Sequence, residues 1–283
     1  MSNTPDKRKW RKLAKTWQCF TSPIRPTAVE INIMERFCRN CLKQPRVRVL
    51  LLGATPEIRD MLSRYRNASV TLLDKNQEMI IAMTKLMKSE GRSETHLFAD
   101  WLRAHLRTNY YNIIIGDSIF ASIQPQFRAQ FLAKVHRWIK QNGVFVIRAA
   151  NYRPKQNPNN LQSALQLFSK RHIDETALSS FSETVLFLVR DPRQGQIQLR
   201  RLKILIDWYV KSNGSRLSRK QKQILTLWRK FYCQNGTFWS PNANALRKHL
   251  ERFFRVVDVK WDPNINMAQS DYELIYKLVP RVG

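Results

Sequence analysis

The segment that decides the fold is VRVLLLGATPE, residues 47–57. Residues 47–52 are almost all branched aliphatic, which is typical of a strand covered on both faces of a parallel sheet. Gly53 permits a tight turn directly after this strand. Thr55 and Pro56 then occupy positions favoured at the N-cap and at the first residue of a helix. The segment therefore predicts a strand, a glycine turn and a helix that runs to about residue 66.

Short apolar runs alternate with helical patterns as far as residue 150. The further strands expected in this region are 70–73, 96–99, 112–115 and 143–147. Near the C-terminus, two alternating runs predict a last antiparallel pair, 255–261 and 273–278. This order of elements is typical of an α/β fold with a parallel sheet.

Between these two regions the pattern changes, because residues 151–240 contain a loop rich in Pro and Asn and then mostly helical periodicity. We interpret this stretch as an insertion between strands five and six. The chain is therefore expected to have four parts: an N-terminal helical arm (1–45), an α/β core (46–150), a helical cap (151–240), and a C-terminal helix with the strand pair that completes the core (241–283).

The chain of 283 residues is strongly basic, since 49 Lys and Arg against 21 Asp and Glu give a formal net charge of +28. A hydrophobic content of 43% is enough for a core and excludes wholesale disorder. Cations cluster in residues 7–15 and 216–230, where they could track the phosphates of a nucleic acid. No RNA-binding module is recognisable and the cations are spread along helices, so a solvated basic surface explains them too.

No apolar run approaches the roughly 18 residues of a membrane helix, and residues 1–15 lack the apolar stretch of a signal peptide. We therefore expect a cytosolic protein with reduced thiols and no membrane partner. Cys38 and Cys41 form a C-x-x-C pair, but no second pair follows to complete a zinc site. Their neighbours fit an amphipathic helix, so we expect packing thiols and no metal.

Each of the first four expected strands ends at a small or acidic residue: Gly53, Asp74, Asp100 and Asp117. Ligands of open α/β sheets bind at these carboxyl ends. Asp74 follows Gly53 by 21 residues and stands where an acid would accept hydrogen bonds from ribose hydroxyls. Asp74 or Asp100 alone could merely cap a helix, but together the four strand ends indicate a nucleoside-containing cofactor.

The residues around Gly53 disfavour a pyrophosphate. A dinucleotide site requires G-x-G-x-x-G, whereas residues 53–58 read GATPEI. Pro56 removes one N–H donor, and Glu57 stands where a phosphate needs positive potential. The P-loop pattern is absent as well, so a cofactor with adenosine but no phosphate fits better.

These segments resemble the motifs of class I, Rossmann-like S-adenosylmethionine-dependent methyltransferases. The resemblance covers residues 47–150 and roughly 241–283, although the first motif has one glycine where the family commonly has three. It implies a seven-stranded sheet that ends in an antiparallel hairpin, with S-adenosyl-L-methionine as the cofactor of the 46–150 core. The residues implied to bind the cofactor are Gly53, Ala54, Thr55, Asp74, Lys75, Met79, Asp100, Trp101 and Asp117.

The resemblance does not name a methyl acceptor. Residues 117–120 read DSIF, where base-amino methyltransferases carry [ND]-P-P-[YF], and no cysteine nucleophile lies near them in the sequence. The Lys-Asp-Lys-Glu set of ribose methyltransferases is matched only by Asp117 and Glu273, with Arg148 in the place of a lysine. Arginine stays charged and cannot act as a base there. Asp117 and Arg148 are the candidates for a catalytic role, and the catalytic group stays unknown.

Four residues are candidates for contact with the acceptor: Trp17, Arg25, Arg148 and Tyr152. Trp17 and Arg25 could form a lid over the cofactor, or belong to a packed N-terminal arm. Arg148 closes an apolar strand, so it must bind an anionic group or form a structural ion pair. We favour a methyltransferase that acts on a small acceptor under the helical cap, with an anionic acceptor among the candidates, because aromatic residues of the cap could wall a pocket. An RNA methyltransferase is the first alternative and a non-catalytic binding protein the second.

Overall fold

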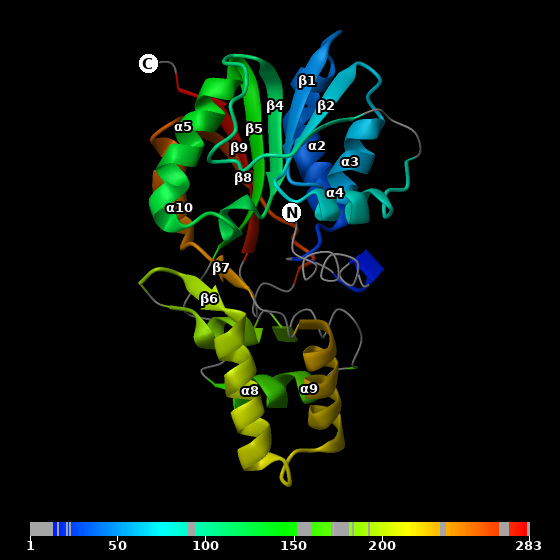
Figure 1. Ribbon diagram of the computed structural model, residues 1–283, viewed down its shortest axis with the longest axis vertical. Coiled ribbons are helices and arrows are strands. Elements are labelled where there is room, and N and C mark those ends of the chain that lie inside the picture. Colours follow the sequence, from blue (N-terminus) through cyan, green and yellow to red (C-terminus); the bar gives the residue numbers. More distant parts are fainter. Residues whose placement is uncertain are drawn as a thin grey trace.

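The computed structural model describes residues 14–15, 17–20, 22, 24–89, 94–151, 160–170, 172, 181–182, 184–191, 193–232, 236–265 and 272–281. Its main sheet has seven strands, shown in Figure 1. In spatial order they are β3 (Thr95–Leu97), β2 (Ala68–Leu73), β1 (Val47–Leu52), β4 (Tyr111–Asp117), β5 (Ile139–Asn151), β9 (Tyr272–Pro280) and β8 (Phe254–Lys260). Neighbours from β3 to β5 are parallel, and β9 is antiparallel to both β5 and β8. The predicted α/β sheet with a terminal antiparallel hairpin is confirmed.

Helices cover both faces of this sheet (Figure 1). One layer consists of α2 (Ala28–Leu42), α3 (Pro56–Ser63) and α4 (Gln77–Thr84), and the other of α5 (Arg128–Trp138) and α10 (Ala243–Glu251). Val49 and Leu51 of β1 belong to the core under the first layer, and Leu50 and Leu52 belong to the core under the second. Both faces of β1 are therefore buried, which is why its sequence is a nearly continuous aliphatic run instead of an alternation of apolar and polar residues.

Local sequence signals fix where the helices begin. Thr27 and Glu30 form a capping box at the start of α2. The Asn76 side chain accepts a hydrogen bond from the Met79 amide and caps α4. Thr55 occupies the expected N-cap position of α3, but its hydroxyl makes no capping hydrogen bond. That hydroxyl instead contacts the Asp117 carboxylate at the carboxyl end of β4.

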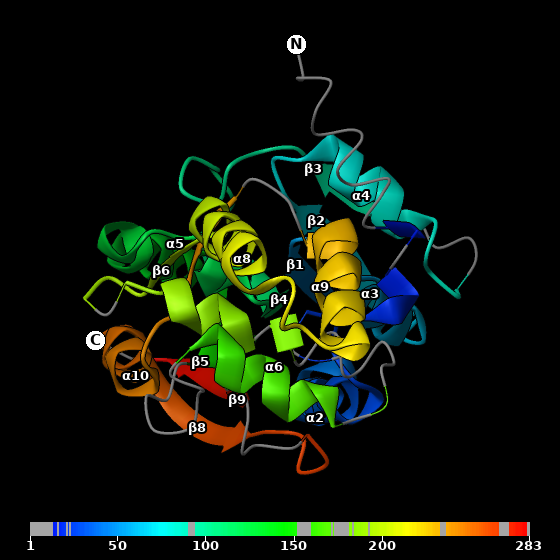
Figure 2. The same cartoon turned by 90° about the horizontal axis from the view of Figure 1, so that it is seen from below.

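The insertion folds around its own apolar core. It contains α6 (Leu161–Ser169), α8 (Leu199–Asn213), α9 (Arg219–Tyr232) and a small sheet of β6 (Gln196–Gln198) and β7 (Thr237–Trp239). This strand pair was not predicted, because each strand has three residues and 41 positions separate their first residues, Gln196 and Thr237. In Figure 1 the insertion lies below the main sheet with β7 between them, and Figure 2 shows α6, α8 and α9 spread across that end. The exact division of the chain into four parts stays a prediction.

Short 3₁₀ helices complete the described chain: Trp17–Cys19, Ile119–Ala121, Pro125–Phe127 and Phe187–Val189. Among the described residues, no helix combines the length and the apolar character needed to cross a membrane. Cys38 and Cys41 belong to α2, and both are free thiols buried in the core on the face of the helix that packs on the sheet. Burial raises the pKa of both thiols.

The strand register brings the predicted ligand residues to one edge. Leu52 at the end of β1 pairs with Leu73 of β2 and with Gly116 of β4. The residues that follow these strands therefore lie side by side, although they are far apart in the sequence. Asp117 pairs in turn with Arg148 of β5, so the same edge continues toward the C-terminal hairpin.

Candidate functional site

A cavity of about 560 Å³ lies at the carboxyl ends of the central parallel strands. All nine residues predicted to bind the cofactor line it: Gly53, Ala54, Thr55, Asp74, Lys75, Met79, Asp100, Trp101 and Asp117. Trp17 from the N-terminal segment and Phe238 from β7 also line it. The cavity is therefore walled by the sheet edge on one side and by residues of the arm and the insertion on the other. A separate hollow on α2, lined by Val29, Asn32, Glu35, Arg36 and Arg39, contains no predicted site residue.

Gly53 forms the turn between β1 and α3 in a conformation that requires glycine. Its φ is +94°, a region that side-chain-bearing residues rarely adopt. A Cβ atom placed there would meet no atom within 4 Å. The glycine is therefore needed for the backbone angle and not for space, and the room in front of it is open to a ligand.

Asp74 follows β2 and is almost fully buried at the cavity wall. Its Oδ1 accepts a hydrogen bond of 2.8 Å from the Asn76 amide. Within the part of the chain that the structure describes, Oδ2 has no such partner. Burial raises the pKa of Asp74 to about 6, although the Asn76 hydrogen bond and the charge of Lys75 oppose this effect. Near neutral pH the carboxylate is thus ionised and has one oxygen available to accept hydrogen bonds from a ligand.

Asp100 and Trp101 form the adjacent wall. Asp100 Oδ1 accepts a hydrogen bond from the Leu102 amide, and Oδ2 lies 3.3 Å from Lys75 Nζ. The Trp101 indole donates a 2.7 Å hydrogen bond to the Leu73 carbonyl, which fixes the ring beside the cavity. Its ring also packs against Phe131. Trp101 therefore both packs against Phe131 and lines the cavity.

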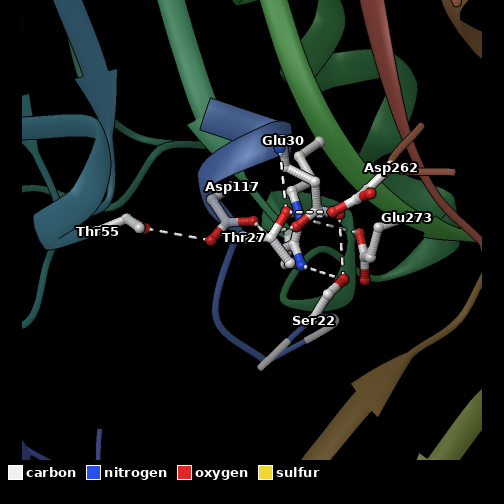
Figure 3. A network of polar contacts seen from close by, with 9 residues as sticks. Ser22, Thr27, Glu30, Thr55, Asp117, Asp262 and Glu273 are labelled. Carbon is white, nitrogen blue, oxygen red and sulfur yellow. Dashed lines mark hydrogen bonds and ion pairs between the residues drawn. The ribbon is translucent and has the colours of Figure 1, made fainter. Parts of the chain in front are cut away.

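Asp117 stands at the end of β4, next to the point where the strand order reverses. Its Oδ2 lies 3.4 Å from the Thr55 hydroxyl, which explains why Thr55 does not cap α3 (Figure 3). The next residue, Ser118, has a φ of +49°, which is unusual for a residue other than glycine. Ser118 also lines the cavity, and its hydroxyl lies 3.3 Å from Asp117 Oδ1. Backbone strain of this kind is commonly held at functional sites.

Asp117 belongs to a buried polar cluster around Arg148, and Figure 3 labels the members Ser22, Glu30, Asp117 and Glu273. Arg148 is fully buried, and its guanidinium lies 2.6 Å from Asp117 and 3.0 Å from Glu30. Glu273 lies 3.9 Å away, and the Ser22 hydroxyl accepts a hydrogen bond of 2.9 Å. Burial lowers the pKa of Arg148, but the three carboxylates outweigh it and hold this pKa well above its ordinary value.

Arg148 therefore lies behind the cavity and does not line it. Its partners come from the N-terminal segment, α2, β4 and β9, so the ion pairs join distant parts of the chain. This geometry does not support contact between Arg148 and an anionic acceptor. It supports the second role considered from the sequence, a structural ion pair. The ion pair with Arg148 also holds the Asp117 carboxylate in place.

The N-terminal segment is tied to the start of α3 through Glu57. The Trp17 indole donates a 2.9 Å hydrogen bond to Glu57 Oε1, and Arg25 Nε donates one of 2.6 Å to the same oxygen. Trp17 contributes to the cavity wall, as predicted for a lid, but Arg25 does not line it. Arg25 thus acts as a clamp on Glu57. Tyr152 lies outside the described residues.

The partial ribose-methyltransferase pattern also has a structural counterpart. Asp117 and Glu273 both lie close to Arg148. The further residue that reaches Arg148 from α2 is Glu30, an acid, whereas the pattern has a second lysine. A fully buried arginine with a raised pKa cannot accept a proton. Arg148 therefore cannot act as the base at the position where the pattern has a lysine.

Several lining residues were not predicted: Ile24, Asn76, Met83, Leu102, Ser118, Ala121, Ser122, Ile123 and Phe238. Asn76, Leu102 and Ser118 lie within two residues of a predicted strand-end acid, so their position in the sequence could have indicated them. Phe238 had no such signal, because it belongs to the unpredicted strand pair. Glu30 was visible only as the last residue of a capping box, which conceals its second contact with Arg148.

Comparison with known proteins identifies the fold. Neither a family model nor a curated protein matches the chain. Among solved structures, the N-methyltransferase NodS from Bradyrhizobium japonicum, in complex with S-adenosylhomocysteine, is 10% identical with a TM-score of 0.53, covering 99% of this chain and 100% of that one. A methyltransferase from Clostridium acetobutylicum is 11% identical with a TM-score of 0.53, covering 89% and 91%. A Rhodobacter sphaeroides protein, provisionally named a zinc-dependent alcohol dehydrogenase, is 15% identical with a TM-score of 0.60, covering 99% and 100%.

These likenesses show the fold, which is that of class I S-adenosylmethionine-dependent methyltransferases. The strand order with a terminal antiparallel hairpin separates it from the dinucleotide-binding sheet, whose sixth strand follows the fifth in parallel. Nor do the described residues contain a group of three or more His, Cys, Asp or Glu that could hold a metal ion. The dehydrogenase name of one neighbour therefore has no counterpart in the described part of this site.

Proposed function

We propose that the protein is an S-adenosylmethionine-dependent methyltransferase that acts on a small acceptor bound between the α/β core and the inserted helices. The observation that carries this proposal is the set of three carboxylates lining the cavity, from Asp74, Asp100 and Asp117. Lys75 is the one cation among the described lining residues, and it pairs with Asp100. Such a site suits a cofactor with a positive sulfonium and ammonium, and it disfavours a pyrophosphate.

The cofactor's parts can be assigned to the wall in the order of the strands. Asp74 would accept hydrogen bonds from ribose hydroxyls through its available oxygen, and Trp101 with Asp100 would flank the base. The turn at Gly53 and the Asp117 carboxylate would then hold the methionine end, next to the reversal of strand order where such folds bind ligands. Bound there, S-adenosylmethionine would supply an electrophilic methyl group.

The acceptor would occupy the remaining space between Asp117 and the insertion. Ser118 and Ser122 provide hydroxyl groups in this wall, and Phe238 closes it from β7. A cavity of about 560 Å³ is within the range of small-molecule sites and leaves limited room beside the cofactor. Positioning and exclusion of water can supply much of the rate of a methyl transfer, so the site does not need a dedicated base. The anionic acceptor group considered from the sequence finds no free cation in the described lining.

Calorimetric titration with S-adenosylmethionine and S-adenosylhomocysteine tests the proposal. We expect micromolar binding by the wild type and about tenfold weaker binding by Asp74→Ala, equivalent to about 1.4 kcal/mol. Asp258→Ala is the matched control, because Asp258 is an exposed carboxylate on β8 outside the cavity lining. Binding of NADH in place of these ligands, or no binding at millimolar cofactor, would contradict the proposal.

Turnover separates catalysis from mere binding. Release of S-adenosylhomocysteine in the presence of a panel of small acceptors, and in the presence of RNA, should identify a substrate among the small molecules. Release with RNA alone would favour the RNA methyltransferase alternative. Tight cofactor binding with no turnover on any acceptor would favour a non-catalytic protein.

A further inference from the structure

The inserted helices carry a large uncompensated positive charge. Residues 193–232 contain eleven Lys and Arg and a single acid, Asp207. The Asp207 carboxylate already pairs with Lys203 and with Arg229. The remaining cations whose side chains the structure describes therefore present their charge to solvent or to an anionic partner.

Helix α8 has apolar residues on two opposite faces. Leu202 and Ile206 are fully buried in the core of the insertion. Ile204 and Trp208, one helical turn apart, are 59% and 62% exposed. At 100° per residue these two side chains point away from that core. In Figures 1 and 2, α8 lies at the outside of the molecule, consistent with an open outer side.

Cations flank this apolar pair along the same side of the helix. Arg200 and Arg201 lie one turn before Ile204, and Lys211 lies about one turn after Trp208. All three are exposed, and within the described ranges none of them forms a salt bridge, although backbone hydrogen bonds, helped by the charge of Arg201, lower the pKa of the Asp191 carboxylate. Arg200 and Arg201 also lie in the first helical turn, where the helix dipole disfavours cations. We call these five residues, Arg200, Arg201, Ile204, Trp208 and Lys211, the outer face of α8.

We propose that the outer face of α8 binds the surface of an anionic phospholipid bilayer. Tryptophan is favoured at the boundary between headgroups and acyl chains, and an aliphatic side chain gains by leaving water for that region. Arginine and lysine beside them are attracted to lipid phosphates. We expected no membrane partner because no segment spans a bilayer, but a peripheral contact of this kind needs no spanning segment.

The aliphatic residue favours lipid over nucleic acid. Proteins that bind single-stranded nucleic acid use cations with aromatic rings on which bases stack. Trp208 and the cations would suit either partner, but Ile204 has neither a ring nor a hydrogen-bond donor. Its exposure beside Trp208 is explained by contact with hydrocarbon, and a bilayer provides it.

The outer face is also connected to the cavity. Helix α8 follows β6 directly, and the Leu199 amide donates a 3.0 Å hydrogen bond to the Gly236 carbonyl at the start of β7. Phe238 of β7 lines the cavity. Given the proposed function, on which this last step alone rests, the membrane contact would bring the cavity close to acceptors that partition into lipid.

Co-sedimentation with lipid vesicles tests the membrane contact. We expect binding to vesicles with about 30% phosphatidylglycerol at about 0.1 M salt, and little binding to pure phosphatidylcholine. The double variant Ile204→Ser/Trp208→Ser should weaken binding at least about tenfold. The matched control is Val257→Ser/Trp261→Ser, which removes an aliphatic residue and a tryptophan, each 42% exposed, at a different surface. That control should bind as the wild type does.

A second readout locates the contact. Phospholipids brominated on their acyl chains should quench the tryptophan fluorescence of the wild type, and most of this quenching should be lost in Trp208→Phe. Calorimetric binding of S-adenosylhomocysteine, measured on the same variants, should be unchanged. If the wild type does not bind S-adenosylhomocysteine, the proposed function is wrong. The vesicle assay still tests the membrane contact in that case, because the assay does not depend on the cofactor.

Two results would overturn the membrane contact. One is vesicle binding that the Ile204→Ser/Trp208→Ser variant retains in full while it stays folded. The other is absence of vesicle binding together with salt-dependent binding of poly(U) that is lost in Trp208→Ser, which would assign the outer face to single-stranded RNA.

Discussion

The pKa of Asp74 predicts a pH dependence of cofactor binding. Burial raises this pKa to about 6, and the carboxylate has one oxygen without a hydrogen-bond partner in the described structure. Ribose hydroxyls would donate to the ionised form, so bound cofactor should favour ionisation and lower the pKa. Affinity should therefore rise as the pH rises through about 6 and level off above it.

The magnitude follows from the fraction ionised. At pH 5, one unit below the pKa, about a tenth of the Asp74 side chains are ionised in the free protein. If the ionised form alone binds well, Kd at pH 5 should be about tenfold higher than at pH 7.5, which corresponds to about 1.4 kcal/mol. Calorimetric titration with S-adenosylhomocysteine at pH 5.0, 6.0 and 7.5 measures this directly.

Protonation of Asp74 does not unfold the protein, so unfolding caused by Asp74 cannot account for weaker cofactor binding at pH 5. Its folded pKa lies above the unfolded value of 3.8, so the folded state holds the proton more tightly. Protonation of Asp74 therefore favours the folded state at pH 5 relative to pH 7.5. Asp74→Asn should bind weakly with no comparable pH dependence, whereas Asp258→Asn, on β8, should behave as the wild type does. A wild-type Kd that is constant within about twofold between pH 5 and 7.5, or that falls at low pH, would refute the reasoning.

Three further substitutions test other parts of the site. Arg148→Met leaves the surrounding buried carboxylates without their cation and should lower the free energy of unfolding by about 3–5 kcal/mol at pH 7 in urea denaturation, and a loss below about 1 kcal/mol would contradict the cluster's structural role. Gly53→Ala forces a side chain into a φ of +94° and should cost about 1–2 kcal/mol, whereas Gly236→Ala, at a glycine without positive φ, should cost about half or less. Glu57→Gln weakens the anchor of Trp17 and should weaken S-adenosylhomocysteine binding by about 0.5–1 kcal/mol, so an unchanged Kd would argue against a closing role for the N-terminal segment.

The strands of the core could be predicted because their signals are local. Residues 47–52 form β1 with the expected bounds, since aliphatic side chains on both faces leave no other place for the segment. Helix ends were less predictable: Leu86 and Met87 continue the apolar helical pattern of α4, yet the helix ends at Thr84. After Met87 the chain turns because the Asp60 carboxylate accepts hydrogen bonds from the Lys88 and Ser89 amides. Contacts between distant residues decide such ends, and no periodicity reveals them.

The same distinction holds for the site. Residues at strand ends were predictable, because the carboxyl ends of parallel strands meet at one edge whatever the rest of the chain does. The cluster around Arg148 was not, because Ser22, Glu30 and Glu273 reach it from segments that meet only in the folded sheet. A charged residue at the end of an apolar strand predicts a buried partner but does not identify it.

The charge of the chain and the charge of its cavity have opposite signs, and each determines a different kind of recognition. The formal net charge of +28 made a nucleic acid a candidate partner, yet three carboxylates line the described cavity wall. Surface charges more than about 8 Å away are largely screened at physiological salt, so the basic surface does not determine which ligand the cavity prefers. The nearby carboxylates do, and they favour a cationic cofactor. The proposed bilayer contact would use the positive surface instead, because an extended anionic partner can meet several cations of the outer face of α8 at once.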